Sequence, residues 1–296
     1  MRLERPLILI GAGRSGSTLA MRLLDAHSAL DFKGETSFLA LRLWNEIWYD
    51  RFWLNWPRQH ALGPRSAADP LPPLRPDELA RERARVGRLV AGCFTELLGV
   101  DRIGHRVWGF KELWSGLPQY DHDWRAYDAI FPEASWLHLV RHPFDFARSC
   151  ARWNGTLLTQ AYLEDRLRNW HQMLECHRLR RSTGRYHEVR FEDLVARPRE
   201  CLMPVLADLD LEWEEAMADA LNARTMASSA DRDDNEQRLS KRDAEALIAR
   251  VPGLGAAMAS LGYRPPRRTG LAVRSRPEVQ IDLRDPEREH PSGGNG

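Results

Sequence analysis

A glycine- and serine-rich loop near the start of the chain constrains the fold more than any other feature. The loop runs from Gly11 to Thr18 and joins an apolar run, Leu7–Ile10, to a stretch from Leu19 onward that has helical spacing. In a strand–loop–helix unit of this kind, free backbone N–H groups and the helix dipole converge on one point and favour an anion there. The pattern therefore predicts an α/β fold that binds a phosphate or sulfate group at the end of its first strand.

Three kinds of anion site are compatible with this loop. As G-x-G-x-x-G it fits a dinucleotide fingerprint, for which Asp31, 20 residues after Gly11, is a candidate ribose-binding acid. As G-x-x-x-x-G it fits a nucleoside triphosphate loop, but Ser17 stands where that site needs a lysine. The third interpretation is a 5′-phosphosulfate site, with Arg14 as the cation and the loop hydroxyls as further ligands. The loop alone does not decide between them.

Short apolar runs recur along the chain and predict buried parallel strands. The runs are Leu7–Ile10, Val107–Phe110, Trp136–Val140 and the weaker Tyr186–Phe191. Patterns with helical spacing lie between them, and one of these begins after Pro76 and stops at Gly99. The alternation predicts an α/β fold with a doubly wound parallel sheet flanked by helices, in a single domain that spans residues 1–264. Residues 265–296 show no core periodicity, and we expect them to be disordered.

Composition narrows the range of partners. The chain has 43 basic and 42 acidic residues, so its net charge is too small to attract nucleic acid or an anionic membrane. Its four cysteines form no C-x-x-C pair and have no histidines at metal-ligand spacing, which predicts a reduced compartment and no structural zinc. No apolar run approaches the roughly 18 residues that span a bilayer. We therefore expect a cytoplasmic protein that binds neither nucleic acid nor membrane, and the oligomeric state stays open, a homodimer included.

A second motif distinguishes the interpretations of the loop. The run Trp136–Val140 ends in Arg141, and Ser149 follows eight residues later, inside the next helix. An arginine and a hydroxyl in this arrangement suit a second phosphate, such as one on the 3′ carbon of a nucleotide. Neither NAD nor ATP carries that group. The ordered pair of motifs resembles the 5′ and 3′ sites of the sulfotransferases that use 3′-phosphoadenosine 5′-phosphosulfate (PAPS).

Within that family, the sequence is most similar to the tyrosylprotein sulfotransferase branch. The matching segments, in chain order, are Arg14–Leu19, Leu24–His27, Gly34–Thr36, Trp108–Lys111, Arg190–Leu194 and Leu261–Tyr263. Together they cover most of the chain before residue 265. Ser37 stands where that branch carries a basic residue, so the sequence leaves the acceptor open between a small molecule and a peptide.

Sulfuryl transfer needs a base for the acceptor hydroxyl, in-line approach to sulfur and a cation for the departing phosphate oxygen. Glu35 is expected on a loop just past the first helix, and the resemblance assigns the role of base to it. The alternative is a solvated loop carboxylate without a catalytic role. Lys111, at the carboxyl end of the Val107–Phe110 run, is the candidate cation near the bridging oxygen, and its alternative is an ion pair with Glu112 or Glu35. Arg14 is the third catalytic candidate. This scheme requires no metal.

The resemblance also implies a set of nucleotide-binding residues. They are Gly13, Arg14, Ser15, Gly16, Ser17, Thr18, Arg141 and Ser149, with Ser228 and Ser229 from a polar segment that covers the nucleotide in the family. The alternative for that last segment is a mobile polar loop. Arg190 and His142 lie beside the predicted site, but the sequence demands no role for either.

An aromatic segment, 43–56, stands apart from these motifs. Trp44 and Trp48 share a helical face, and Trp53 and Trp56 follow closely. One interpretation is a hydrophobic core over the sheet, and the other is the aromatic wall of an acceptor pocket.

For the chain as a whole, a PAPS-dependent sulfotransferase is the leading hypothesis. A Rossmann-type NAD(P)-dependent oxidoreductase that uses Asp31 is the second, and an inactive nucleotide-binding protein is the third.

Overall fold

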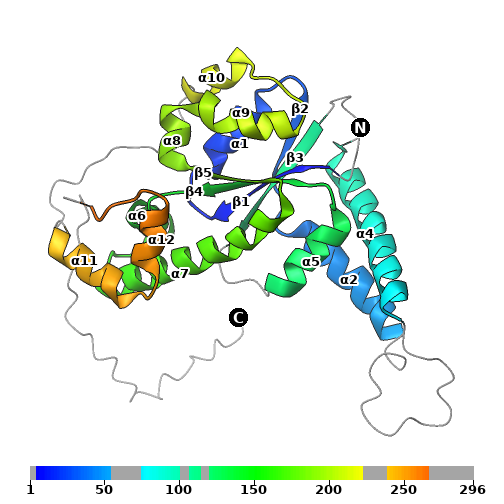
Figure 1. Ribbon diagram of the computed structural model, residues 1–296, viewed down its shortest axis with the longest axis horizontal. Helices are drawn as coiled ribbons and strands as arrows, with labels where there is room; N and C mark the ends of the chain where they lie inside the picture. The colour runs from blue at the N-terminus through cyan, green and yellow to red at the C-terminus, as the bar shows by residue number, and fades with distance from the viewer. Residues whose placement is uncertain (1–4, 55–74, 101–106, 115–119, 223–238, 267–296) are drawn as a thin grey trace, which may run out of the picture.

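The computed structural model describes residues 5–54, 75–100, 107–114, 120–222 and 239–266, and these build an α/β structure around one sheet (Figure 1). All of its strand pairs are parallel, and the strand order is β2-β3-β1-β4-β5. The strands are β1 (Leu7–Ala12), β2 (Leu30–Glu35), β3 (Val107–Trp114), β4 (Ser135–Val140) and β5 (Tyr186–Arg190). The predicted doubly wound parallel sheet is confirmed.

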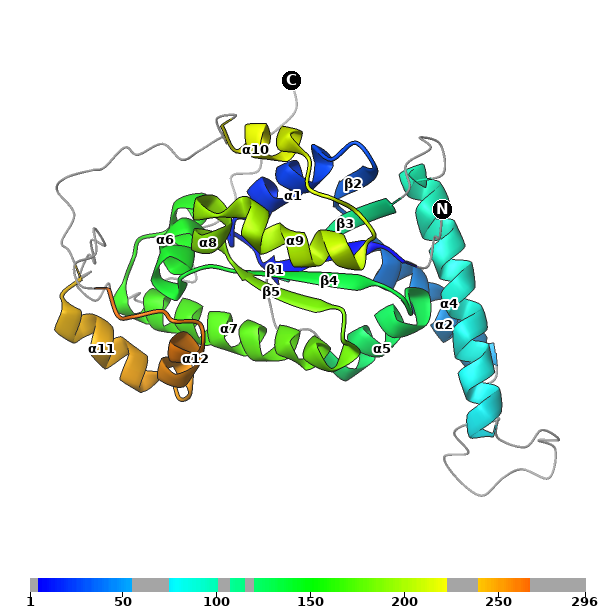
Figure 2. The ribbon, with the colours of Figure 1, turned by 45° about the horizontal axis from the view of Figure 1, so that its top comes forward.

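Helices cover both faces of this sheet (Figure 2). On one face lie α1 (Ser17–Asp25), α8 (Phe191–Ala196), α9 (Pro198–Asp208) and α10 (Glu215–Asn222). On the other lie α2 (Leu39–Leu54), α4 (Pro76–Leu98), α5 (Tyr120–Ile130), α6 (Pro143–Asn154), α7 (Gln160–Arg178), the 3₁₀ turn η2 (Leu179–Thr183), α11 (Lys241–Arg250) and α12 (Leu254–Ser260). Since α4 begins at Pro76 and ends before Gly99, which has a left-handed φ of 63°, the predicted bounds of this helix are confirmed.

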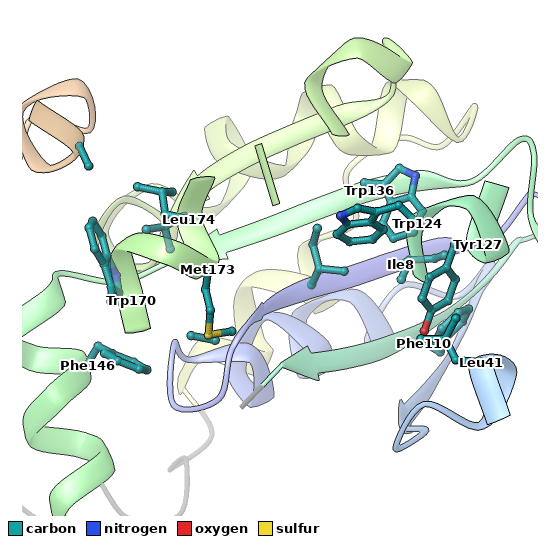
Figure 3. Packing of buried hydrophobic residues seen from close by; sticks show 14 of the residues in the cluster. Ile8, Leu41, Phe110, Trp124, Tyr127, Trp136, Phe146, Trp170, Met173 and Leu174 are labelled. Atoms are coloured by element: carbon teal, nitrogen blue, oxygen red, sulfur yellow. The ribbon is translucent and has the colours of Figure 1, made fainter. Parts of the chain in front are cut away.

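The alternation of side chains along β1 divides the core into two clusters. Leu7 and Leu9 pack under α1 and α9, while Ile8 and Ile10 face the larger cluster on the opposite side. A central parallel strand covered on both faces must be apolar at every position, which is why the run lacks a polar alternation. Figure 3 shows part of the larger cluster, in which Trp124 meets Trp136 edge to face at 5.2 Å between ring centroids.

Two predictions about the strands were wrong. The run Val107–Phe110 continues in β3 as far as Trp114, because pairing with β1 holds the chain extended beyond the apolar residues. Lys111 therefore lies inside a strand and not after one. Glu35, expected on a loop, is the last residue of β2, an edge strand whose register shifts between Phe32 and Glu35.

The aromatic segment contributes to the core. Trp44 is buried on α2 and stacks on Trp48 with 5.1 Å between ring centroids, and the guanidinium of Arg83 lies over the Trp48 ring. The core interpretation is therefore confirmed for Trp44, while the side chain of Trp53 and all of Trp56 lie outside the described residues. Ser228, Ser229 and residues 267–296 lie outside them too, so the predictions for those positions and for the domain boundary stay predictions.

Candidate functional site

The glycine-rich loop turns sharply between β1 and α1. The N–H of Ser15 donates to the carbonyl of Ala12 at 3.1 Å, and Arg14 has a φ of 75°. Gly16 caps α1 with a φ of 97°, and a Cβ at this position would lie 2.1 Å from the ring of Phe191. Glycine is therefore required at position 16 on two counts. No side chain caps the start of α1, so its first N–H groups face the loop.

The loop hydroxyls fit an anionic ligand. Ser15 and Ser17 are buried, and Ser15 Oγ has no hydrogen-bond partner among the described residues. A buried hydroxyl without a partner beside free helix N–H groups is costly unless a ligand completes its bonding. These groups suit the oxygens of a phosphate or sulfate. Thr18, the second residue of α1, is exposed.

The second predicted motif meets the loop in space. A guanidinium nitrogen of Arg141, at the end of β4, donates to the carbonyl of Arg14 at 3.3 Å. Arg14 Nε in turn donates to Ser149 Oγ, on α6, at 3.4 Å. Two segments more than 120 residues apart therefore converge at the carboxyl end of β1 and β4, where ligands bind in open α/β sheets.

Arg141 sits in a partly dehydrated position. Burial lowers the pKa of its guanidinium, against the nearby Asp145 and Glu192, which favour the charged form. Its guanidinium carbon lies 4.9 Å from the centroid of the Phe191 ring. Phe191 thus packs between Gly16 and Arg141. Sequence reasoning gave Phe191 no role, although it belongs to the Arg190–Leu194 segment.

Arg14 has a second neighbour that the sequence did not suggest. Its guanidinium carbon lies 4.5 Å from the centroid of the Trp153 ring, and Trp153 is 72% exposed. Trp153 follows Ser149 by one turn of α6, so helical spacing alone places both on one face. The structure brings Arg14 to the Ser149 side of the loop, and its proposed contact with the reacting group stays a prediction.

Glu35 and Lys111 meet on the other side of β1. The two residues are register partners at the end of β2 and in β3, and Lys111 Nζ lies 3.3 Å from Glu35 Oε2. The lysine side chain is nearly buried, whereas the carboxylate is half-exposed. The ion pair named as the alternative for Lys111 is therefore present, and it joins two of the predicted catalytic residues. The rest of the carboxylate is exposed to solvent.

Asp31 does not occupy a ribose-binding position. Its carboxylate pairs with Lys33 Nζ at 2.8 Å, and its register partner is Trp108, near the start of β3. A dinucleotide fold binds at the carboxyl ends of its strands and places β2 beside β1, whereas here β3 lies between them. The oxidoreductase interpretation is therefore not favoured.

Comparison with protein families decides the class. The model of the sulfotransferase family matches residues 6–215, which is more than half of the chain. The chain belongs to the sulfotransferase family. The matched range includes the glycine-rich loop, Glu35, Lys111, Arg141 and Ser149. A comparison with curated proteins found no significant match.

Several solved structures are similar to this sulfotransferase. The sulfotransferase domain of the Synechococcus PCC 7002 olefin synthase is 20% identical, with coverage of 73% of this chain and 76% of that one and a TM-score of 0.46. Sulfotransferase STF9 from Mycobacterium avium is 16% identical, with 93% and 79% coverage and a TM-score of 0.48. Mouse sulfotransferase SULT7A1 complexed with PAP is 10% identical, with 75% and 65% coverage and a TM-score of 0.42.

The two other polar residues beside the site hold the C-terminal part of the fold. The backbone N–H of His142 donates to Glu192 at 2.9 Å, and its ring Nε2 lies 3.0 Å from the carbonyl oxygen of Arg264. Arg190 donates to the carbonyl of Leu261 at 2.7 Å and pairs with Asp193. Within the described ranges no group of acidic, cysteine or histidine side chains is placed to hold a metal ion. In the same ranges no helix is long and apolar enough to cross a membrane.

A buried carboxylate, Glu112, lies behind the Glu35–Lys111 pair. Its side chain is fully buried and accepts hydrogen bonds from the Thr36 hydroxyl and, at 3.0 Å, from the Phe38 backbone N–H. Burial raises the pKa of Glu112 to about 7, although these bonds favour the ionised form. Sequence reasoning considered Glu112 only as an ion-pair partner for Lys111, and the lysine pairs with Glu35 instead.

This raised pKa predicts how stability depends on pH. Because the folded state holds the proton up to about pH 7 and the unfolded state only to about 4.5, the ionisation of Glu112 lowers the free energy of unfolding as pH rises through that window. At about 1.4 kcal/mol per pH unit, the loss reaches roughly 3 kcal/mol. In denaturant unfolding, the free energy of unfolding of Glu112→Gln should therefore rise by about this amount relative to that of the wild type between pH 4.5 and pH 8. Glu46→Gln, at an exposed position of α2, should show no such trend. A stability difference for Glu112→Gln that does not change with pH would contradict the prediction.

Proposed function

We propose that this sulfotransferase moves a sulfuryl group from PAPS to a hydroxyl or amine acceptor by in-line displacement, with Glu35 as general base. The observation that carries the proposal is the pairing of Glu35 with Lys111 at 3.3 Å, where Lys111 lies next to β1, the strand that leads into a loop suited to an anion. One group can accept the acceptor proton and the other can neutralise charge that develops on the leaving oxygen.

The site divides into two regions on either side of β1. The loop from Gly13 to Thr18 would hold the 5′-phosphosulfate with its N–H groups and hydroxyls, near Lys111. Arg141 and Ser149 would hold the 3′-phosphate, because both contact Arg14 near the end of β4. Arg14 lies between the regions and would contact the nucleotide from the loop. Ser228 and Ser229 complete the proposed set from outside the described residues.

The acceptor is proposed only as a class. The similarity to the tyrosylprotein branch suggests a phenolic hydroxyl, on a small molecule or a peptide, because a phenol loses its proton more readily than an alcohol does. The half-exposed face of Glu35 suits either acceptor. We propose that the transfer needs no metal, since Lys111, Arg14 and Arg141 provide the positive charge that PAPS requires.

A binding experiment tests the nucleotide assignment. Adenosine 3′,5′-bisphosphate should bind at least about tenfold more tightly than adenosine 5′-monophosphate, because each charge-assisted bond to the extra phosphate contributes roughly 1.5–3 kcal/mol. Arg141→Ala should remove most of that preference, as measured by isothermal titration calorimetry. The matched control is Arg148→Ala, which removes an arginine that pairs with Asp145 on the same helix. Equal affinity of the wild type for both nucleotides would overturn the 3′ site.

The same titration addresses the competing hypotheses. Preference for NAD(H) over adenosine 3′,5′-bisphosphate would revive the oxidoreductase hypothesis. Tight binding of adenosine 3′,5′-bisphosphate, without transfer from PAPS to any member of a broad panel of phenols, alcohols and amines, would favour an inactive nucleotide-binding protein.

A further inference from the structure

The turn that follows Glu35 has an unusual backbone. Ser37 and Phe38 have φ values of 50° and 60°, so two consecutive residues with side chains adopt the left-handed conformation. Each such residue costs free energy and persists only where its surroundings hold it. This turn directly follows Glu35 and joins the end of β2 to the start of α2.

Glu112 bonds to this turn on both sides of Ser37. One carboxylate oxygen accepts from the hydroxyl of Thr36, and the other accepts from the backbone N–H of Phe38 at 3.0 Å. The backbone is tied on the same segment, because Thr36 N–H donates to the carbonyl of Lys111 at 3.2 Å. Glu112 thus spans the strained residue with two hydrogen bonds from a fixed place in β3.

The position of Glu112 excludes it from contact with substrate. It is fully buried, and along β3 it follows Trp108 and Phe110 on the face of the larger core cluster, opposite to Lys111. The groups that face it are Thr36, Phe38 N–H, the Tyr127 side chain from α5 and the more distant Glu35 carboxylate. An apolar residue would suit this face better for stability, since burial opposes the ionised form of Glu112.

We propose that Glu112 is a positioning residue, which holds the left-handed turn at Ser37 and Phe38 so that Glu35 faces Lys111 and the acceptor. The inference rests on the proposed function, because it assumes that Glu35 acts on the acceptor. Glu112 itself transfers no proton. Burial of this carboxylate costs stability, and in return its two hydrogen bonds fix the turn at the end of β2.

Three variants separate positioning from general stability. Glu112→Ala removes both hydrogen bonds, and Thr36→Val removes one of them with little change of shape. Glu112→Gln keeps an acceptor for the Phe38 N–H, and its amide can donate to the Thr36 oxygen. The matched control is Phe110→Leu, which reduces packing on the same face of the same strand without touching the turn.

Steady-state kinetics with PAPS and a phenol should show a fall in kcat with little change in KM for PAPS. Displacement of a catalytic group by about 1 Å can cost up to ~100-fold in rate, so we expect kcat to fall about 10- to 100-fold in Glu112→Ala and less in Thr36→Val. Glu112→Gln should stay within about threefold of the wild type. Phe110→Leu should lose thermal stability but keep its kcat. An unchanged kcat in Glu112→Ala, or the same loss in Phe110→Leu, would overturn the proposal.

A second readout does not depend on turnover. Hydrogen–deuterium exchange of the peptide that covers residues 35–42 should quicken in Glu112→Ala and stay slow in Glu112→Gln and Phe110→Leu. Adding Ser37→Gly to Glu112→Ala should restore part of the lost kcat, because glycine adopts a φ of 50° without strain. If the wild type fails to use PAPS, the proposed function fails while the exchange result still decides whether Glu112 holds the turn. Unchanged exchange in Glu112→Ala would overturn the inference whatever the activity.

Discussion

Replacing Glu35 by glutamine is expected to lower turnover with PAPS by about 10²–10⁴-fold while the affinity for adenosine 3′,5′-bisphosphate changes less than about twofold. The substitution keeps the shape of the side chain and its place at the end of β2, and it removes the proton acceptor together with the charge that pairs with Lys111. Because the carboxylate is half-exposed and its contact is Lys111, the fold should not depend on its charge. Single-turnover kinetics and nucleotide titration measure the two quantities separately.

The matched control for this experiment is Glu46→Gln, which makes the same chemical change at an exposed position of α2. Turnover of the control should equal that of the wild type. Near wild-type turnover of Glu35→Gln with a phenol or an alcohol would show that Glu35 is a bystander. His142, the next candidate that the sequence offers, contacts the C-terminal segment in this structure, so another base would then have to be sought.

The parts of the site that could be predicted from sequence are those fixed by local chemistry. The loop before Ser17 needs glycines, a strand before it and a helix after it, and all three leave a pattern within twenty residues. The same holds for Arg141 and Ser149, because a strand end and the next helix set their spacing. Their convergence across more than 120 residues followed from the rule that parallel strands present their carboxyl ends on one edge.

The parts that could not be predicted depend on pairing between distant segments. β2 has only three apolar or buried residues before Lys33 and Gly34, which are typical of a loop, and it forms because β3 provides a partner. Phe191 and Trp153 gain their contacts with Arg141 and Arg14 only when α8 and α6 pack around the loop.

Glu112 is the clearest case of a residue whose place the sequence does not disclose. A charged residue that follows a lysine is expected to be exposed to solvent. Because side chains alternate along β3, however, Glu112 points into the aromatic core on the same face as Trp108 and Phe110. A sequence pattern shows only that this residue is polar. Its proposed role depends on two hydrogen bonds to residues more than seventy positions away.

Replacing Lys111 by alanine is expected to weaken both turnover and nucleotide binding, in contrast to Glu35→Gln. A cation near the bridging oxygen meets the phosphate in the ground state and gains more as charge develops, so we expect turnover to fall about 10²–10³-fold and the affinity for PAPS about tenfold. The matched control is Lys33→Ala, which removes another lysine in an ion pair, on the neighbouring strand near Asp31. That variant should keep both quantities.

The ion pair between Lys111 and Glu35 makes their effects on turnover interdependent. If both groups act on the same transition state, Glu35→Gln combined with Lys111→Ala should lose much less than the product of the single losses, as groups that work as one unit do. Multiplicative losses would instead mean that the 3.3 Å contact is incidental to catalysis. Full nucleotide affinity in Lys111→Ala, with turnover as low as in Glu35→Gln, would place the lysine at the acceptor and not at the phosphate, and the assignment of the leaving-group cation would pass to Arg14.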